Sequence, residues 1–211
     1  MAFMHMYFGA PGCGKSTYAA KLVRQCVKSN TPVYTNFPCK GALRLDVSSI
    51  GVQDLRDCLV IIDEAGIVYN NREFKSFPKP ALEFFKLHRH YGVSLVFLSQ
   101  GWDDCDKKIR NLCTSYFNMS KLGPFTFIRR FAKRVGVDQD SKQIIDEYFK
   151  VSLLSGGLHF LFRPLYYKMF DSWDAPALMR RVDRPWYSSS LSSQQFKLLR
   201  TCRRSLFPSC K

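Results

Sequence analysis

A nine-residue stretch near the N-terminus, GAPGCGKST at residues 9–17, constrains the fold of this chain more than any other feature. It fits the pattern G-x-x-x-x-G-K-[ST] of phosphate-binding loops. The apolar run at residues 3–8 predicts a short buried strand before it, and the apolar spacing from Lys15 onward predicts an amphipathic helix after it. The order strand, glycine loop, helix favours a phosphate-binding loop over an ordinary glycine-rich turn.

The residue types of this stretch suit a nucleoside triphosphate bound with Mg²⁺. Glycines let main-chain N–H groups turn inward around phosphate oxygens, and the helix N-terminus adds the positive end of its dipole. We expect Lys15 to reach the β- and γ-phosphates, Ser16 to ligate Mg²⁺ and Thr17 to contact the α-phosphate. The predicted nucleotide-binding set is Gly9, Ala10, Pro11, Gly12, Cys13, Gly14, Lys15, Ser16 and Thr17.

A second motif is the acidic pair Asp63 and Glu64, which follows a continuous apolar run that predicts a buried strand. Asp63 is predicted to hold Mg²⁺ through a water molecule, and Glu64 to act as the general base that polarises the attacking water. Taken alone, such a pair also suits a helix cap. Its position about fifty residues beyond the loop, with one strand-like segment at 33–38 between them, favours ATPases with an additional strand and a catalytic glutamate over GTPases and small-molecule kinases.

The next apolar segment, residues 93–100, predicts a strand that ends at Gln100. By analogy with the water-positioning glutamine of other NTPases, we expect Gln100 to sense the γ-phosphate; the alternative is a strand-end turn residue. Arg72, Arg89 and Arg110 also follow motif strands, and one of them could enter a neighbouring subunit's site. We favour Arg89 because the HRHYG segment places it at a helix end, although each arginine also suits a solvated surface charge.

The alternation of strands and helices predicts an α/β fold, a P-loop NTPase with a mostly parallel sheet flanked by helices. After Gly123-Pro124 the pattern changes, and a small β-containing C-terminal extension is expected, with strands at 125–133 and 159–173 and a helix at 141–154. The predicted division is therefore an ATPase core at 1–122, an extension of that core at 123–175 and a basic, flexible tail at 176–211.

The charge balance indicates polyanionic partners, because 32 Lys and Arg face 17 Asp and Glu, a net charge of +15. The predicted tail carries eight basic residues against one Asp, so it suits either an anionic membrane surface or a solvated tail. No signal peptide is evident, and the longest uncharged apolar stretch of the C-terminal part, at 151–162, is too short to span a membrane.

Five segments in this order, GAPGCGKST, YTNFP, VIIDEAG, LHRHYGVSLVFLSQ and DKKIRNLC, resemble the zonula occludens toxin family, the assembly ATPases of filamentous phages. The likeness covers residues 3–122 and continues faintly to 176. It implies an ATPase with ATP and Mg²⁺ at the cytoplasmic side of the host inner membrane, which drives extrusion of single-stranded phage DNA. Family members typically continue into a transmembrane helix and an extracytoplasmic domain, neither of which is expected within these 211 residues, so the toxin activity of that part is not carried over. We expect this sequence either to be the cytoplasmic module alone or to reach the membrane through partners or its basic tail.

Three functions are compatible with these motifs. The first is a motor ATPase, a homo-oligomeric ring that works with phage assembly and membrane proteins; a ring is expected because an arginine supplied in trans requires a neighbour. The second is a helicase or packaging translocase that contacts single-stranded DNA through the aromatic and basic segments FTFIRRFAK and FRPLYYK, which also suit ordinary amphipathic strands. The third is a nucleotide-dependent assembly scaffold that does not hydrolyse ATP.

Overall fold

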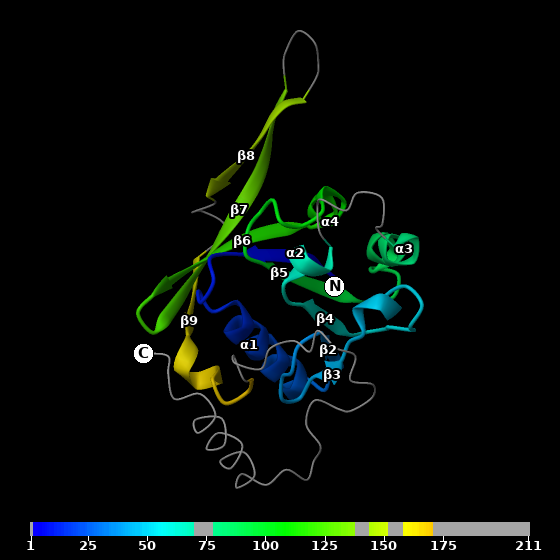
Figure 1. The fold of residues 1–211 in the computed structure, drawn as a ribbon, viewed down its shortest axis with the longest axis vertical. Coiled ribbons are helices and arrows are strands. Elements are labelled where there is room, and N and C mark those ends of the chain that lie inside the picture. Colours follow the sequence, from blue (N-terminus) through cyan, green and yellow to red (C-terminus); the bar gives the residue numbers. More distant parts are fainter. Residues whose placement is uncertain (1, 70–77, 138–143, 152–157, 171–211) are drawn as a thin grey trace, which may run out of the picture. The chain divides into compact units, whose positions relative to one another are not determined.

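The computed structural model describes residues 2–69, 78–137, 144–151 and 158–170, and within them it forms one sheet with helices on both faces (Figure 1). The strands are β1 Met4–Phe8, β2 Val33–Thr35, β3 Leu43–Arg44, β4 Leu59–Ile62, β5 Ser94–Ser99, β6 Ser115–Leu122, β7 Phe125–Val137, β8 Ile144–Val151 and β9 Leu158–Phe162. The helices are α1 Lys15–Lys28, α2 Ala65–Val68, α3 Lys79–Leu87 and α4 Lys107–Leu112, with short 3-10 helices η1 Val47–Ser49 and η2 Arg163–Tyr166.

The sheet has the order β3-β2-β4-β5-β1-β6-β7-β8, and β9 pairs with β7 beside the β7–β8 pair. All pairings from β3 to β6 are parallel, whereas β7 runs antiparallel to β6, β8 and β9. The strand that precedes the acidic pair, β4, is not the neighbour of β1, because β5 lies between them. The predicted α/β fold with a mostly parallel sheet and an additional central strand is therefore confirmed.

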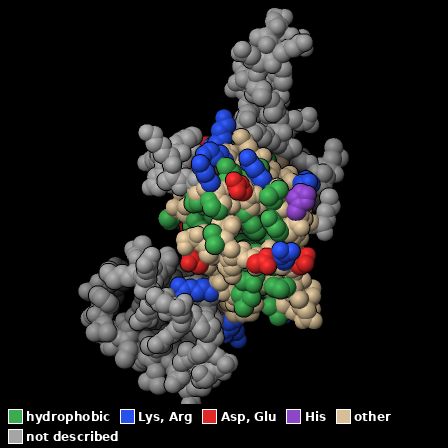
Figure 2. Space-filling model, turned by 90° about the vertical axis from the view of Figure 1, so that its right-hand side faces the viewer, with side chains coloured by type: hydrophobic (Ala, Val, Ile, Leu, Met, Phe, Trp, Pro, Cys, Tyr) green, Lys and Arg blue, Asp and Glu red, His purple; other side chains and the backbone are tan. Residues whose placement is uncertain are grey.

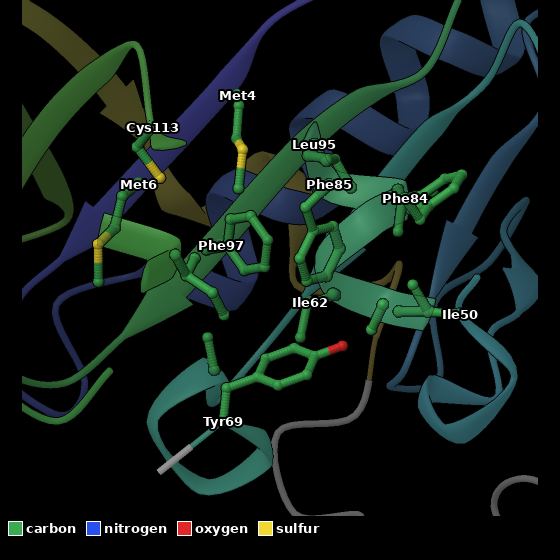
Figure 3. Close-up of a cluster of buried hydrophobic side chains, with 14 of the residues drawn as sticks. Met4, Met6, Ile50, Ile62, Tyr69, Phe84, Phe85, Leu95, Phe97 and Cys113 are labelled. Atoms are coloured by element: carbon green, nitrogen blue, oxygen red, sulfur yellow. The ribbon is translucent and has the colours of Figure 1, made fainter. Parts of the chain in front are cut away.

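Alternating side chains of the central strands fill two cores, one on each face of the sheet. Met4 and Met6 of β1 pack with Phe85 of α3 and Ile109 of α4 on one face. Figure 3 shows this cluster, in which Phe85, Phe97, Ile62 and Tyr69 gather from α3, β5, β4 and the end of α2. On the other face Tyr7, Ile61 and Leu98 pack with Ala19, Ala20 and Val23 of α1. The phosphate loop pattern thus lies between a central strand and a helix that are both anchored in the core.

The predicted helix from Lys15 is confirmed as α1, which ends at Lys28 before Asn30, a residue in the left-handed region at φ 53°. Pro32 follows and bars continuation of the helix. None of the described helices combines the length and the apolar composition that crossing a bilayer requires.

The antiparallel extension corrects two sequence-based expectations. Residues 141–154 were expected to be helical, but Ile144–Val151 is strand β8, paired with the long strand β7. The segment IIDEYFKV is rich in Ile, Tyr, Phe and Val, which favour strands, and pairing with β7 decides between the two conformations. The strand expected at 159–173 ends already at Phe162, because Pro164 lacks the N–H that a ladder needs and the chain turns into η2.

The extension does not form a sheet of its own. β7 and β9 continue the same sheet as β1 to β6, and Met1–Pro176 is one compact unit. The predicted basic tail at 176–211 lies outside the described residues.

Candidate nucleotide-binding site

The loop between β1 and α1 requires glycine at three of its positions. Gly12 and Gly14 have φ of 74° and 102°, in the left-handed region that residues with a Cβ rarely adopt. Gly9 adopts an ordinary φ, but a Cβ there would lie 2.3 Å from the carbonyl oxygen of Met119 on β6. The loop therefore combines backbone turns that expose its N–H groups with a close approach to the neighbouring strand, as the pattern predicts.

Lys15 begins α1 and folds back over the loop that precedes it. Its ammonium donates hydrogen bonds to the carbonyl oxygens of Gly9 at 2.7 Å and Ala10 at 3.3 Å. The residue is only 6% exposed, and Thr17 in the same turn of α1 is also buried. A buried cation that bonds to neutral oxygens at a helix N-terminus is well placed to receive an anion.

Ser16 and Asp63, the two predicted metal ligands, are in direct contact. The Ser16 hydroxyl donates to Asp63 Oδ2 at 2.8 Å, although the residues lie on α1 and after β4. Burial raises the pKa of the Asp63 carboxyl, the Ser16 hydrogen bond opposes this shift, and the nearby Glu64 carboxylate adds to it. Hard oxygen donors of this kind, beside a phosphate loop, fit Mg²⁺.

Asn36, in the segment after β2, fixes the backbone of Asp63. Its side-chain amide donates to the Asp63 carbonyl oxygen at 2.9 Å and accepts from the Asp63 N–H at 2.7 Å. The second oxygen of Asp63 accepts the N–H of Glu64 at 2.9 Å. Asn36 lies in the YTNFP segment of the family resemblance, but no role was predicted for it; the usable signal is a polar side chain directly after β2, the strand that neighbours β4.

Glu64 and Gln100, the predicted base and sensor, also meet. Gln100 follows β5, and its Nε2 lies 3.1 Å from both carboxylate oxygens of Glu64. Glu64 adopts a left-handed conformation at φ 52°, ψ 46°, which turns its side chain away from the direction of β4. A non-glycine residue in this region is strained by about 1–2 kcal/mol, and such strain concentrates at functional sites.

Two of the three candidate arginines, Arg89 and Arg110, lie within the described residues. Arg89 is exposed in the turn before β5, at the amino end of a strand whose carboxyl end carries Gln100, so it is remote from the loop of its own chain. Its action in a neighbouring subunit stays a prediction. Arg110 forms an ion pair with Asp103 at 3.0 Å and lies over the ring of Trp102. Arg72 lies outside the described residues.

Two further residues reach the loop from the C-terminal extension, and no local sequence pattern marks either of them. Thr126 of β7 donates its hydroxyl hydrogen to the Cys13 carbonyl oxygen at 2.6 Å. Arg163 of η2 donates to the Gly12 carbonyl oxygen at 3.4 Å. Both contacts depend on the antiparallel strands that return beside β6, and this return is visible only in the folded chain.

A family model for zonular occludens toxin (Zot) matches residues 39–154, more than half of the chain. The chain belongs to the Zot family. The match includes Asp63, Glu64, Arg89 and Gln100, whereas the phosphate loop precedes it. A search of curated proteins found no match.

Among solved structures, the N-terminal domain of zonular occludens toxin from Neisseria meningitidis superposes with a TM-score of 0.53 at 17% identity, covering 81% of this chain and all of that one. The genome packaging NTPase B204 of Sulfolobus turreted icosahedral virus 2, in complex with ATP-gammaS, has a TM-score of 0.45 at 13% identity, covering 71% and 96%. The DNA-packaging ATPase B204 from Sulfolobus turreted icosahedral virus has 0.44 at 11%, also covering 71% and 96%. Zot-family membership and the P-loop NTPase fold together support a nucleotide-driven ATPase.

Proposed function

We propose that this Zot-family chain hydrolyses ATP with Mg²⁺ and couples the reaction to assembly and extrusion of filamentous single-stranded DNA phage at the cytoplasmic side of the host inner membrane. The observation that carries the hydrolytic part is the convergence of Ser16 with Asp63, and of Glu64 with Gln100, at the carboxyl ends of neighbouring strands beside the loop. Family membership supports the ATPase, and the phage role is proposed from the resemblance of the five sequence segments to the phage assembly ATPases.

The loop and Lys15 bind the triphosphate in this proposal. Main-chain N–H groups of residues 12 and 14–17 face the phosphate oxygens at the N-terminus of α1, while the Cys13 N–H stays bonded to the Ala10 carbonyl. The ammonium of Lys15 exchanges the carbonyls of Gly9 and Ala10 for the β- and γ-phosphates. Ser16 and Asp63 would hold Mg²⁺, which supplies charge neutralisation between the β- and γ-phosphate oxygens. Asn36 keeps Asp63 in place for this task.

Glu64 is the general base. It accepts a proton from a water whose oxygen attacks the γ-phosphorus, while the bond from that phosphorus to the β–γ bridging oxygen breaks, yielding ADP and phosphate. In the structure its carboxylate is occupied by the amide of Gln100. A γ-phosphate offers the Gln100 amide another acceptor, so arrival of ATP frees Glu64 for the water.

A second candidate, a translocase that contacts single-stranded DNA itself, is favoured by one surface feature. On the outward face of β7 and β9, Phe125 contacts Phe162 at 5.3 Å between ring centroids, and Phe127 contacts Phe160 at 4.8 Å. Phe160 is 56% exposed, and aromatic rings beside basic residues can stack unpaired bases. ATP-dependent strand displacement would support this candidate, and its absence with retained hydrolysis would support the assembly ATPase.

Phosphate release by the purified chain, with and without single-stranded DNA, tests the hydrolytic part. Glu64→Gln is expected to keep nucleotide affinity and to lower turnover at least a hundredfold, because the amide cannot accept the proton. Lys15→Ala is expected to weaken nucleotide binding itself. Glu83→Gln on the exposed side of α3 is the matched control and leaves both unchanged. A folded wild-type chain with no affinity for MgATP would overturn the proposal.

The proposed phage role can be tested only in cells that produce the phage. Lys15→Ala and Glu64→Gln variants are expected to abolish release of phage particles while leaving phage DNA synthesis intact, and the wild-type protein is expected at the inner membrane. Particle release by the Glu64→Gln variant at the wild-type level would instead favour a scaffold that binds nucleotide without splitting it.

A further inference from the structure

Arg163 is a buried cation that the C-terminal extension carries to the phosphate loop. It begins η2, directly after β9, and only 8% of the residue is exposed. Its guanidinium donates to three carbonyl oxygens, those of Gly12 in the loop at 3.4 Å, Pro124 at 3.4 Å and Gly123. One side chain therefore ties the turn between β6 and β7 to the glycine loop.

The charge of Arg163 has no carboxylate partner within the part of the chain that the structure describes. The ion pairs there are Arg56 with Asp54 and Arg110 with Asp103. A buried charge is costly unless an opposite charge or strong hydrogen bonds compensate it, and carbonyl oxygens compensate it only in part. Lys15 has the same character, so two buried cations, bonded to carbonyl oxygens, flank the same loop.

The contact with the loop is close. A Cβ built on Gly14 would lie 3.0 Å from Cδ of Arg163 and 2.4 Å from the hydroxyl of Thr126. Thr126 donates to the Cys13 carbonyl and Arg163 to the Gly12 carbonyl, so two consecutive loop residues are hydrogen-bonded from the extension, which leaves no room for a side chain at Gly14. The Cys13 carbonyl shares its peptide with the Gly14 N–H, so holding that carbonyl directs this N–H to the other side of the peptide, where phosphate oxygens bind; the Cys13 N–H itself donates to the Ala10 carbonyl oxygen at 3.2 Å.

We propose that Arg163 is a second cation of the nucleotide site, supplied in cis by the β-extension: it positions the loop through Gly12, and its charge stabilises the bound phosphates. This inference rests on the proposed nucleotide function. It also assigns a task to the extension, since η2 can reach the loop only because β7 and β9 return along β6.

Nucleotide titrations of the full chain test this role. Binding of a non-hydrolysable ATP analogue, ADP and adenosine is measured by calorimetry for wild type, Arg163→Gln and Arg163→Lys. Arg163→Gln keeps a neutral donor but removes the charge, so we expect about tenfold weaker binding of the ATP analogue, a smaller loss for ADP and none for adenosine. Arg163→Lys is expected to recover most of the loss. Arg129→Gln, an exposed arginine of β7, is the matched control and is expected to bind as wild type does.

The outcomes separate the two proposals. Unchanged analogue binding by Arg163→Gln, with binding by the wild type, would overturn the role of Arg163 alone. Equal losses for all three ligands in both Arg163 variants would overturn the charge role, because a displaced loop does not distinguish phosphate number. No binding by the wild type would overturn the nucleotide function, and this inference with it.

A milder variant covers the case in which Arg163 variants do not fold. Thr126→Val preserves side-chain shape but removes the hydrogen bond to Cys13. If the extension positions the loop, this variant is expected to bind the ATP analogue and ADP more weakly than the wild type, by a similar, severalfold factor. An unchanged melting temperature would show that the variant is folded. Wild-type affinity for both nucleotides in Thr126→Val would contradict positioning of the loop by the extension.

Discussion

Asp63 is held by groups from three separate segments, and its environment shows how single residues prepare this site. The Ser16 hydroxyl binds one carboxylate oxygen, the Glu64 N–H binds the other, and the Asn36 amide brackets the backbone. The carboxylate therefore has little freedom to rotate. Preparation of this kind matters for a metal ligand, because outer partners of ligands typically contribute roughly 10–100-fold to metal affinity or activity.

The role of Asn36 is testable by its removal. Asn36→Ala deletes both hydrogen bonds to the Asp63 backbone, so we expect the Mg²⁺ concentration for half-maximal ATP hydrolysis to rise, and turnover to fall, by roughly tenfold. Binding of nucleotide without Mg²⁺ is expected to be unchanged. The measurement is phosphate release across a Mg²⁺ titration, with exposed Gln25→Ala of α1 as control. A normal Mg²⁺ profile in Asn36→Ala would exclude this positioning role.

At the scale of elements, the pairing of β1 with β6 buries a titratable group, His5, that couples stability to pH. His5 of β1 stacks on Phe3 at 4.3 Å and lies 5.3 Å from the ring of Phe117. Burial, aided by the positive charge of Arg130 on β7, lowers the pKa of His5 to about 4. The unfolded chain takes up this proton near pH 6.5. The folded chain therefore binds fewer protons than the unfolded chain between these values.

The sign of the effect follows from this difference in proton uptake. Stability contributed by neutral His5 is fully present above about pH 6.5 and is lost as the pH falls toward 4. Because the side chain is partly solvated, we expect a loss of about 1.5 kcal/mol rather than the full value of the shift. Urea unfolding at about pH 4.5 and about pH 7.5 measures it. His5→Phe should reduce the difference between the two pH values; an undiminished difference would assign the pH dependence to other groups.

Whether a feature could be predicted from the sequence depended on whether it lies within one element or requires the pairing of distant elements. The loop, the acidic pair and Gln100 could be recognised because each is a short motif of consecutive residues at the end of a strand. Their proximity could be predicted because parallel strands bring their carboxyl ends to one edge of the sheet. Strand β8 could not, since a short apolar and polar mixture suits a helix as well as a strand until β7 pairs with it. Arg163 and Thr126 could not either, because their contact with Gly12 and Cys13 depends on the antiparallel return of the chain.

At the scale of the whole molecule, charge points to a polyanionic partner. The net charge of +15 acts over distances set by salt, so binding to single-stranded DNA or to anionic lipid should weaken as salt is raised. On the face drawn in Figure 2, acidic side chains are interspersed among the basic and hydrophobic ones, and several Lys and Arg gather toward one end. The described surface is thus not uniformly basic.

The proposed ring makes a prediction about mixtures of variants. Lys15→Ala lacks a functional loop, and Arg89→Ala lacks the arginine that we expect to enter a neighbour's site. Each alone is expected to be inactive, and mixing them is expected to restore part of the ATP hydrolysis, because a Lys15→Ala subunit can supply Arg89 to an intact loop. Arg24→Ala, an exposed change on α1, serves as the control partner. Full turnover by a strict monomer would exclude the ring.

The central position of β1 in the sheet affects how the chain folds during synthesis. Among the described strands, β1 is synthesised before the others, yet its neighbours are β5, where Met4 pairs with Leu95, and β6, where His5 pairs with Ser115. Contacts between residues so distant along the chain form slowly, and Arg163 is synthesised later still than either neighbouring strand. During synthesis β1 therefore waits for both of its partner strands, and the loop that follows it waits for Arg163. Until those segments have been synthesised, the apolar side chains of β1 stay exposed and are prone to aggregation.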